Sequence, residues 1–321
     1  MRIARNLAAF AVGLCVASST FAQGYPSMPV RVIVPFTAGS GLDIVARMLS
    51  QKLTEFWGQP VAVENHIGVG GTVGAGVVAK SPPDGYTLLV NTTAHAVNVA
   101  LYSKLPYDPV KDFVDVSPLV AQPYVLVAGT SAGIKTVSDL IAAAKAKAGQ
   151  LKFGSAGTGS GTHMIAEKFR LAAGIDVVHL PNKGGPEANA DAIAGRVTYW
   201  FPPIAVALPQ VREGRLLAVG MSSARRSSLL PDVPTIAETG LAGFEDTIWY
   251  GMWAPAATPA EVVNQLSKDV ARALATPDVR DRLSKLGAEP MNMTPAEFAR
   301  FVRSESDGAV RVVKAAGIKP Q

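Results

Sequence analysis

The 321-residue chain has 48% hydrophobic and 17% charged residues, and its formal net charge is +5. Its basic residues are scattered and form no patch interleaved with aromatic side chains, which argues against nucleic acid as a partner. The one cysteine, Cys15, lies in the N-terminal leader, so the rest of the chain excludes a disulfide scaffold, a thiolate nucleophile and a cysteine-based metal site.

Residues 1–22 have the pattern of a secretory signal peptide. Arg2 and Arg5 form a positive start, a short apolar stretch follows, and Thr20-Phe21-Ala22 places small residues at a cleavage site. The apolar stretch is shorter than the ~20 residues that a membrane-spanning helix needs. We expect export and cleavage after Ala22, which leaves residues 23–321 with a formal charge of +3 and ample length for two domains.

Short β-rich segments alternate with helical patterns in the first two thirds of the remaining chain. The expected strands lie at 30–35, 61–64, 86–90, 124–128, 151–154, 177–181, 198–201 and 216–220. Apolar residues at helical spacing between them predict helices around 44–49 and 137–144. This alternation indicates an α/β fold with mostly parallel sheets.

The C-terminal part has a different pattern and is expected to be helical. Capping boxes with proline at the first helical position occur at Thr258-Pro259-Ala260-Glu261 and Thr294-Pro295-Ala296-Glu297. A weaker version is Thr276-Pro277-Asp278. We interpret these helices as packing elements without chemistry.

The expected course of the chain makes two lobes. Gln122-Pro123 precedes a strand and is the expected crossing out of the first lobe, and the polar segment 222–228 follows the expected return. Residues 23–122 and 222–321 would then form lobe 1, and residues 123–221 lobe 2. Two lobes joined in this way can close around a ligand.

A glycine- and hydroxyl-rich loop at 36–43 joins the first strand to the first helix. It would place free backbone N–H groups and a small hydroxyl at a helix N-terminus, which is a suitable site for an anion. Asp43 is either the N-cap residue or a group that orders the loop or meets a polar part of the ligand. The candidate ligand-binding residues of this loop are Phe36, Ala38, Gly39, Ser40, Gly41 and Asp43.

A second loop of this kind occurs at 154–163, again between a strand and a helix. Its glycine spacing fits neither a dinucleotide fingerprint nor a phosphate-binding Walker loop. His163 either packs against the loop at the start of the helix or contacts the ligand. The candidate ligand-binding residues are Ser155, Ala156, Gly157, Thr158, Gly159, Ser160, Thr162 and His163.

Two further segments are weaker candidates. The loop after the strand at 86–90 is either an ordinary turn or a ligand contact, because α/β clefts bind ligands at the carboxyl ends of strands. Its candidates are Thr92, Thr93, Ala94 and His95. Lys183 is either a cation for a ligand carboxylate or a solvated side chain.

Catalytic and metal-binding patterns are weak. No nucleophile-elbow motif surrounds Ser40, Ser155 or Ser160, and the four histidines lack metal-ligand spacing. Their order indicates neither a catalytic triad nor a metal site, and we expect no cofactor and a small anion as the bound molecule.

The sequence resembles the Bug family, the extracytoplasmic solute receptors of tripartite tricarboxylate transporters, along nearly the whole expected mature chain. The resemblance rests on the order and spacing of Tyr25-Pro26, Pro29-Val30-Arg31, Val34-Pro35-Phe36, Gly39, Asp43-Ile44-Val45-Ala46-Arg47, Pro83-Asp84-Gly85-Tyr86-Thr87-Leu88, 157–163, Lys183-Gly184-Gly185, 231–238 and Trp249-Tyr250-Gly251. It implies a periplasmic protein without enzyme activity and with a two-lobed type II binding-protein fold, in which two mixed sheets flanked by helices are joined by a two-strand hinge. Loop amides and hydroxyls would hold a ligand carboxylate.

The resemblance also implies two membrane partners, a large permease and a small membrane subunit, and we expect a monomer. Two positions depart from the family: Ser40 replaces the second of two usual glycines, and Asn182 stands where tyrosine is common. The aromatic segment 199–203 either forms a wall for an aromatic carboxylate or is a buried strand end. A dicarboxylate, an amino acid and an aromatic acid all remain open as ligands. A signalling receptor and a secreted serine hydrolase that uses Ser155 or Ser160 are the alternative functions.

Overall fold

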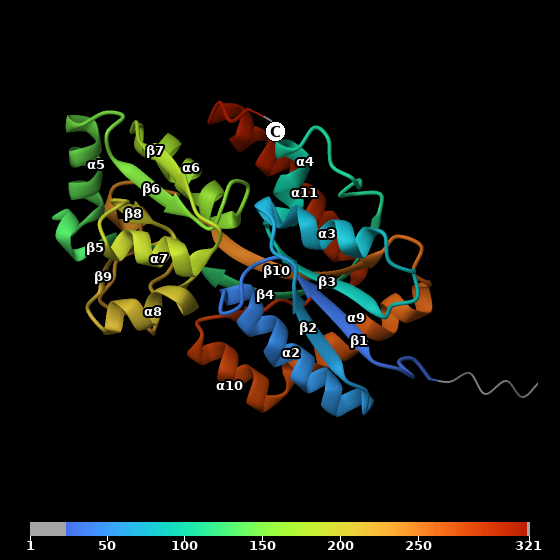
Figure 1. Ribbon diagram of the computed structural model, residues 1–321. Coiled ribbons are helices and arrows are strands. Elements are labelled where there is room, and N and C mark those ends of the chain that lie inside the picture. Colours follow the sequence, from blue (N-terminus) through green and yellow to red (C-terminus); the bar gives the residue numbers. More distant parts are fainter. Residues whose placement is uncertain (1–23, 320–321) are drawn as a thin grey trace, which may run out of the picture.

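The computed structural model describes residues 24–319, so the expected signal peptide lies outside the described residues. Figure 1 shows two lobes, each built on one β-sheet. The sheet of lobe 1 has the order β11 (Glu289–Pro290), β4 (Phe113–Pro123), β10 (Thr247–Pro255), β3 (Thr87–Thr92), β1 (Val30–Val34), β2 (Val61–Asn65). The sheet of lobe 2 has the order β7 (Val178–Pro181), β6 (Lys152–Ser155), β8 (Tyr199–Trp200), β5 (Val125–Gly129), β9 (Leu216–Met221).

Both sheets are mixed, as the family resemblance implies. Strand β1 pairs in parallel with β2 and β3, and β6 pairs in parallel with β7 and β8. Strand β10 is antiparallel to β3 and β4, β11 is antiparallel to β4, and β5 is antiparallel to β8 and β9. The expectation of mostly parallel sheets was wrong, because β10, which was not predicted, pairs antiparallel with both of its neighbours in lobe 1, and β5 does the same in lobe 2.

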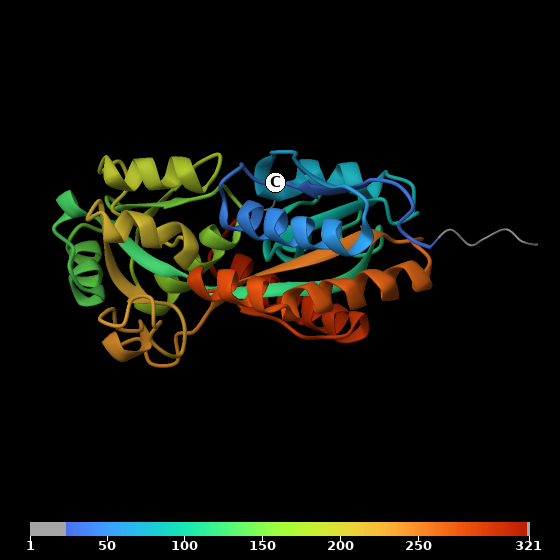
Figure 2. The same ribbon diagram turned by 90° about the horizontal axis from the view of Figure 1, so that it is seen from below.

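Helices cover both faces of the sheet in lobe 1 (Figure 2). One face carries α2 (Gly41–Trp57), α9 (Ala260–Ala275) and α10 (Pro277–Lys285). The other carries α3 (Thr72–Ala79), α4 (Ala94–Leu101) and α11 (Pro295–Ala315), with the short 3₁₀ helix η1 (Val69–Gly71) before α3. On this second face Trp249 and Trp253 of β10 pack on Phe298 of α11.

Lobe 2 has the same layered construction. Helices α5 (Val137–Ala146) and α6 (Gly161–Ala173) pack on one face of its sheet, and α7 (Gly185–Ile193) and α8 (Ile204–Arg212) pack on the other. Two 3₁₀ helices, η2 (Thr130–Ala132) and η3 (Ala237–Thr239), complete the elements. The helices α6 and α7 begin at the end of the lobe that faces lobe 1 (Figure 1).

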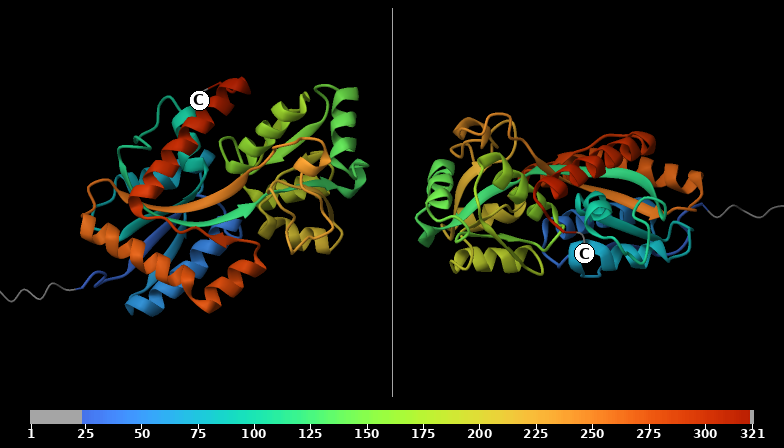
Figure 3. Two further views of the ribbon diagram at one scale, coloured as in Figure 1. Left: turned by 180° about the vertical axis from the view of Figure 1, so that it is seen from behind. Right: turned by 90° about the horizontal axis from the view of Figure 1, so that it is seen from above.

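Two crossings join the lobes (Figure 3). The chain leaves β4 at Pro123 and enters β5 at Val125. After β9 it stays beside lobe 2, where Met221 bridges Thr235, and it re-enters the first sheet at Thr247, which pairs with Pro123. The return therefore lies at Thr247 rather than at residue 222, because the intervening segment packs on β9.

One of the expected helix caps forms in full. The hydroxyl of Thr294 accepts from the amide of Glu297, whose carboxylate accepts from the amide of Thr294, which is a complete capping box. The other two expectations were wrong. Thr258 makes no cap bond, because α9 begins one residue later than expected, with Pro259 as its N-cap residue, and the hydroxyl of Thr276 donates to the carbonyl of Ala273 instead.

Gly251 of β10 lies directly under the aromatic cluster of lobe 1. A Cβ added to Gly251 would lie 2.7 Å from Cη2 of Trp253 and would clash with Phe298. We expect Gly251→Ala to lower the free energy of unfolding by about 1–3 kcal/mol, because overpacking forces buried rings out of place. Urea denaturation measures this, with Gly308→Ala in α11 as the control, where the nearest atom, of Arg311, is 3.7 Å away. Equal midpoints and slopes for the two variants would contradict the prediction.

Candidate functional site

A cavity of about 50 Å³ lies between the lobes. From lobe 1, the start of α2, the end of β3 and strand β10 line the cavity. From lobe 2, the starts of α6, α7 and α8 and the end of β8 line it. The lining residues are Phe36, Ser40, Gly41, Leu42, Thr92, Ala156, Ser160, Gly161, Thr162, Gly185, Trp200, Pro203, Val206, Ile248 and Tyr250. None of these described residues is charged.

The start of α2 is held by a reciprocal cap. The extended Ser40 is the N-cap residue, and its hydroxyl accepts from the amide of Asp43 at 3.3 Å. The carboxylate of Asp43 accepts in return from the amide of Gly39 at 3.0 Å. The amides of Gly41 and Leu42 belong to the first turn, where the helix supplies no acceptor, and both residues line the cavity.

Asp43 orders this loop from behind. Its carboxylate accepts from Nε of Arg47 at 3.0 Å and from Nδ2 of Asn65 at 2.8 Å. Burial raises the pKa of Asp43, but the hydrogen bonds from Arg47, Gly39 and Asn65 outweigh burial and leave the pKa below its ordinary value. The N-cap alternative for Asp43 was wrong, since Ser40 fills that position, and Asp43 does not line the cavity.

The start of α6 repeats this geometry. Ser160 is its extended N-cap residue, and its hydroxyl accepts from the amide of His163 and donates to the carbonyl of Gly157 at 2.7 Å. The hydroxyl of Thr162 accepts from the amide of Ala156 at 2.8 Å. The amides of the first turn again lie at the cavity, so two helix N-termini face it from opposite lobes.

A histidine pair supports the second loop from behind. The rings of His163 and His179 stack at 4.0 Å, and Nδ1 of His163 accepts from the amide of Gly159 at 3.2 Å. Burial, with a smaller contribution from the charge of Arg170, lowers the pKa of His163 to about 4, and burial, with a smaller contribution from the adjacent His163, lowers that of His179 to about 3. Both rings are therefore neutral at neutral pH.

Ser155 lies in this supporting layer as well. Its Oγ is 2.7 Å from Nε2 of His179, which resembles the nucleophile–base pair of a serine hydrolase. However, the Ser155 side chain has no exposed surface, and the low pKa of His179 makes it a weak base. The geometry therefore gives Ser155 a structural role in the loop.

A third helix N-terminus reaches the cavity from lobe 2. Gly185, the first residue of α7, lines the cavity, and Pro186 follows it. A Cβ on the preceding Gly184 would lie 2.5 Å from Oγ1 of Thr37 in lobe 1. Glycine at 184 thus allows the two lobes to meet beside the cavity.

The loop after β3 contributes one lining residue. Thr92 lines the cavity, and its Oγ1 accepts from the amide of Ala94 at 3.0 Å. Thr93 faces the start of α6, because its Oγ1 is 2.5 Å from the position that a Cβ of Gly161 would take. His95 lies in the core between Trp253 and Phe113, and burial lowers its pKa to about 4.

The structure brings part of the sequence-predicted set together. The predicted residues that line the cavity are Phe36, Ser40, Gly41, Thr92, Ala156, Ser160 and Thr162. Those outside its lining are Ala38, Gly39, Asp43, Thr93, Ala94, His95, Ser155, Gly157, Thr158, Gly159, His163 and Lys183. The side chain of Lys183 is exposed, and its amide donates to Glu187 at 2.7 Å.

Leu42 and Gly161, which also line the cavity, lie inside the two loops predicted at 36–43 and 154–163, and the lining residues outside the predicted segments are Gly185, Val206, Ile248 and Tyr250. Gly161 repeats the place of Gly41 directly after an N-cap serine. The two interpretations of the aromatic segment 199–203, a wall of the ligand site and a buried strand end, each hold for part of it. Tyr199 and Phe201 are buried in the core, whereas Trp200 and Pro203 line the cavity.

Residues 24–319 contain no group of three or more side chains that could together hold a metal ion. None of the helices in this part of the chain has both the length and the apolar character needed to cross a bilayer.

Comparisons with known proteins point in one direction. Residues 45–318 match the model of the tripartite tricarboxylate transporter family receptor. The chain is 33% identical to BugT of Bordetella pertussis strain Tohama I, over 99% of both chains. The structure of R. palustris Rpa4515 with adipate superposes with a TM-score of 0.89 at 33% identity, over 92% of this chain and all of that one. The structure of MatC from Rhodopseudomonas palustris with bound malate gives 0.84 at 35% identity, over 90% of this chain and all of that one.

The buried His95 and His163 and the half-buried His179 predict acid sensitivity. Their pKa values in the folded protein, about 4 for His95 and His163 and about 3 for His179, lie below the ordinary value near 6.5. The unfolded chain therefore binds more protons below pH 6.5, and stability falls as the pH falls from about 6.5 towards 4. Each histidine contributes a slope of at most about 1.4 kcal/mol per pH unit. Urea unfolding across this range measures the slope.

His179→Gln should reduce this slope, and His66→Gln at a partly exposed position is its matched control. A His179→Gln protein with the slope of the unmutated protein would contradict the assignment.

Gly161 is expected to control closure of the lobes. A Cβ at this position would lie 2.5 Å from Oγ1 of Thr93 in lobe 1 and would clash with the hydroxyl of Tyr124. We expect Gly161→Ala to favour a more open form, with a larger radius of gyration by small-angle X-ray scattering and at least about tenfold weaker ligand binding, since overpacking costs about 1–3 kcal/mol. Gly308→Ala is the control, and an unchanged radius in Gly161→Ala would refute this role.

Proposed function

The chain belongs to the tripartite tricarboxylate transporter receptor family, and from this premise we propose that it captures a small carboxylate between its two lobes and delivers it to a membrane transporter. The match over residues 45–318 and the near full-length similarity to BugT confirm the Bug-family resemblance. Members of this family are solute-binding receptors and not enzymes. The two relatives of known structure described above contain adipate and malate, which are both dicarboxylates.

The observation that carries the proposal is the convergence of three helix N-termini on one uncharged cavity. Gly41 of α2, Gly161 of α6 and Gly185 of α7 all line it. Each helix N-terminus has the effect of roughly half a positive charge, and its first amides lack acceptors within the helix. A carboxylate supplies both the negative charge and the acceptors that these ends lack.

One further donor lies at the cavity. Nε1 of Trp200 is buried and has no hydrogen-bond acceptor among the described residues. A buried donor without an acceptor costs about 1–3 kcal/mol, so an acceptor on the ligand would stabilise the closed form. Leu42 and Ile248 provide apolar surface for the ligand's carbon chain.

The proposed mechanism is closure about the two crossings. Contacts between the lobes adjoin the cavity at Thr37 with Gly184 and at Thr93 with Gly161. A carboxylate that bridges the starts of α2 and α6 makes its full set of contacts only when the lobes are closed. The ligand therefore shifts the population towards the closed form.

Periplasmic location, cleavage after Ala22, a monomeric state and delivery to a large permease and a small membrane subunit are parts of the same proposal. They rest on the signal-peptide pattern of residues 1–22 and on family membership. The ligand class is the part that can be tested first.

Thermal-shift measurements on refolded, ligand-free protein test the proposal. A panel of mono-, di- and tricarboxylates, amino acids and aromatic acids should contain compounds that raise the melting temperature with increasing concentration, because they bind only the folded protein. A bound compound should be recovered chemically unchanged. No shift across the panel, with the protein shown to be folded, would overturn the carboxylate assignment.

Trp200→Phe removes the unpaired donor while keeping an aromatic ring. We expect it to weaken binding of the best carboxylate by about tenfold, since a hydrogen bond to a charged group contributes about 1.5–3 kcal/mol. Trp57→Phe is the matched control, because the indole of Trp57 donates to Asp269 in lobe 1, away from the cavity. Isothermal titration calorimetry measures both, and equal affinities would exclude Trp200 as a ligand contact.

A further inference from the structure

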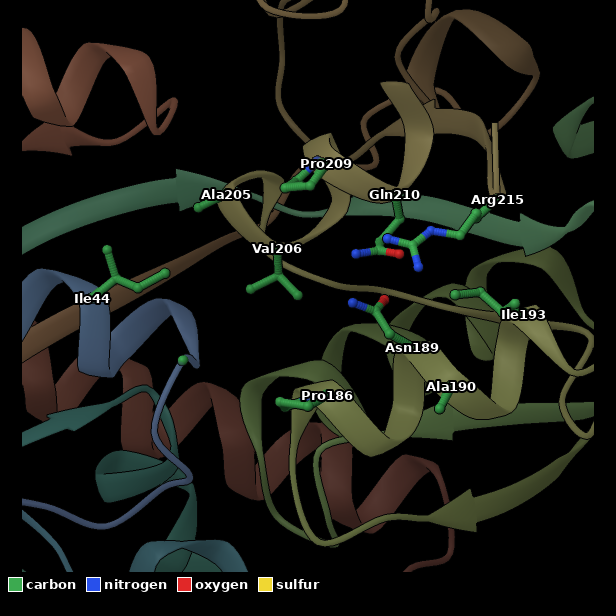
Figure 4. Close-up of a pocket in the computed structure, with 11 residues that line it drawn as sticks. Ile44, Pro186, Asn189, Ala190, Ile193, Ala205, Val206, Pro209, Gln210 and Arg215 are labelled. Carbon is green, nitrogen blue, oxygen red and sulfur yellow. The ribbon is translucent and has the colours of Figure 1, made fainter. Parts of the chain in front are cut away.

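A second and larger cavity, of about 430 Å³, lies between α7 and α8 (Figure 4). We call it the α7–α8 groove. Its walls come from lobe 2, but Gly39 and Ile44 of lobe 1 also line it. In Figure 4 Ile44 lies at one end of the groove and Arg215 at the other. The groove therefore begins where the lobes meet and runs into lobe 2.

Val206 of α8 lies between this groove and the interlobe cavity, because it lines both. Residues that are neighbours in the sequence also line the two different spaces. Ser40 lines the interlobe cavity and Gly39 lines the groove, and likewise Gly185 lines the interlobe cavity and Pro186 lines the groove. The side chain of Val206 is thus the boundary between two adjoining spaces.

The sizes of the two spaces differ in a way that matters for a ligand. A cavity needs about 10–15 Å³ of this kind of volume for each water molecule, so the interlobe cavity of about 50 Å³ has room for a carboxylate and a few further atoms. The remainder of a longer molecule needs more space. The α7–α8 groove adjoins the lining of the interlobe cavity and provides such space.

The groove contains a cluster of polar side chains. Figure 4 shows Asn189 of α7 pointing towards Gln210 of α8 and towards Arg215, which follows that helix. The side chain of Asn189 belongs to a residue that is only 9% exposed, and its Oδ1 has no hydrogen-bond partner among the described residues. Such a buried acceptor is costly unless a partner arrives, which points to a ligand or an ordered water at this place.

Arg215 gives the cluster a positive charge. Its guanidinium forms an ion pair with Glu213 through one terminal nitrogen, and both side chains are about half exposed. A guanidinium has five N–H donors, so donors remain for a second carboxylate. Pro186 and Pro209 line the groove between this cluster and Val206 with apolar surface.

We propose that the α7–α8 groove is the distal half of the ligand site and that the ligand is an elongated dicarboxylic acid. One carboxylate is held at the starts of α2 and α6, the carbon chain passes Val206, and the second carboxylate meets Arg215 and Gln210. A protonated or water-bridged distal carboxyl supplies the donor that Oδ1 of Asn189 lacks. Val206 then limits which chains can reach the groove. This inference rests on the proposed function and specifies its ligand class.

A chain-length series tests the inference. Isothermal titration calorimetry of the ligand-free protein with succinate, adipate, suberate and sebacate, and with the matching monocarboxylates hexanoate and octanoate, should show affinity that rises with chain length among the diacids. The longer diacids should bind at least about tenfold more tightly than the monocarboxylates of equal length, because a charged hydrogen-bonded pair contributes about 1.5–3 kcal/mol.

Three variants locate the distal carboxylate. Arg215→Gln should weaken the long diacids about tenfold and leave succinate unchanged, whereas Arg212→Gln, at the exposed arginine that ends α8, should change neither. Glu213→Gln should strengthen the long diacids, because it frees Arg215 from its ion pair. Val206→Phe should weaken the long diacids more than succinate, because a larger side chain at this boundary crowds the interlobe cavity and also closes the way into the groove.

The outcomes separate this inference from the proposed function. Carboxylate binding without any dependence on chain length, or long-diacid affinities that are equal in Arg215→Gln and Arg212→Gln, would overturn the distal site and leave the receptor intact. A preference for succinate over all longer diacids would also overturn it. No binding of any carboxylate by folded protein would overturn the proposed function itself.

Discussion

The constraint on which the rest of this structure depends is the meeting of three positive helix ends at one small cavity. The ends of α2, α6 and α7 face the same space, and the described residues that line it include no negative side chain. Like partial charges repel, so an empty closed form is electrostatically unfavourable. An anion at this point removes the repulsion and adds hydrogen bonds, and closure is thereby coupled to occupancy. The receptor needs no charged side chain at the cavity because the backbone amides at the three helix ends supply the positive electrostatic potential.

Close packing explains the glycines at two of these helix starts. Each of the three helices begins with glycine, at Gly41, Gly161 and Gly185. A Cβ on Gly41 would lie 2.6 Å from the hydroxyl of Tyr250 in the sheet of the same lobe, and one on Gly161 would lie 2.5 Å from Oγ1 of Thr93 in the opposite lobe. The serine before Gly41 and the serine before Gly161 cap their helices in the same geometry. The serine–glycine pair thus combines a helix cap with a residue small enough for close packing, and at α6 this packing is against the opposite lobe.

Local sequence patterns predicted much of the fold and part of the site. All eight expected strands exist, and both serine–glycine loops stand where they were expected, because turn chemistry and caps are local properties. Strands β4 and β10 were missed because they are mostly buried on both faces and so lack an alternating pattern. The contributions of β10, α7 and α8 to the cavity depend on how distant segments pack, which no local pattern reveals. His95 was predicted as a ligand contact because it comes shortly after the end of a strand, yet its ring packs in the aromatic core.

The side chains directly behind the cavity determine whether the electrostatic potential inside it changes with pH. His163 and His179 lie directly behind the loop that starts α6, and an imidazolium there would add positive charge next to an already positive helix end. Burial holds the pKa of both rings at about 4 or below, so they remain neutral hydrogen-bonding groups through the neutral range. On the other side, the bonds from Arg47 and Asn65 keep Asp43 ionised behind the start of α2. The charges around the cavity therefore do not change between mildly acidic and mildly alkaline pH. Any pH dependence of carboxylate capture in that range has to come from ionisation of the ligand.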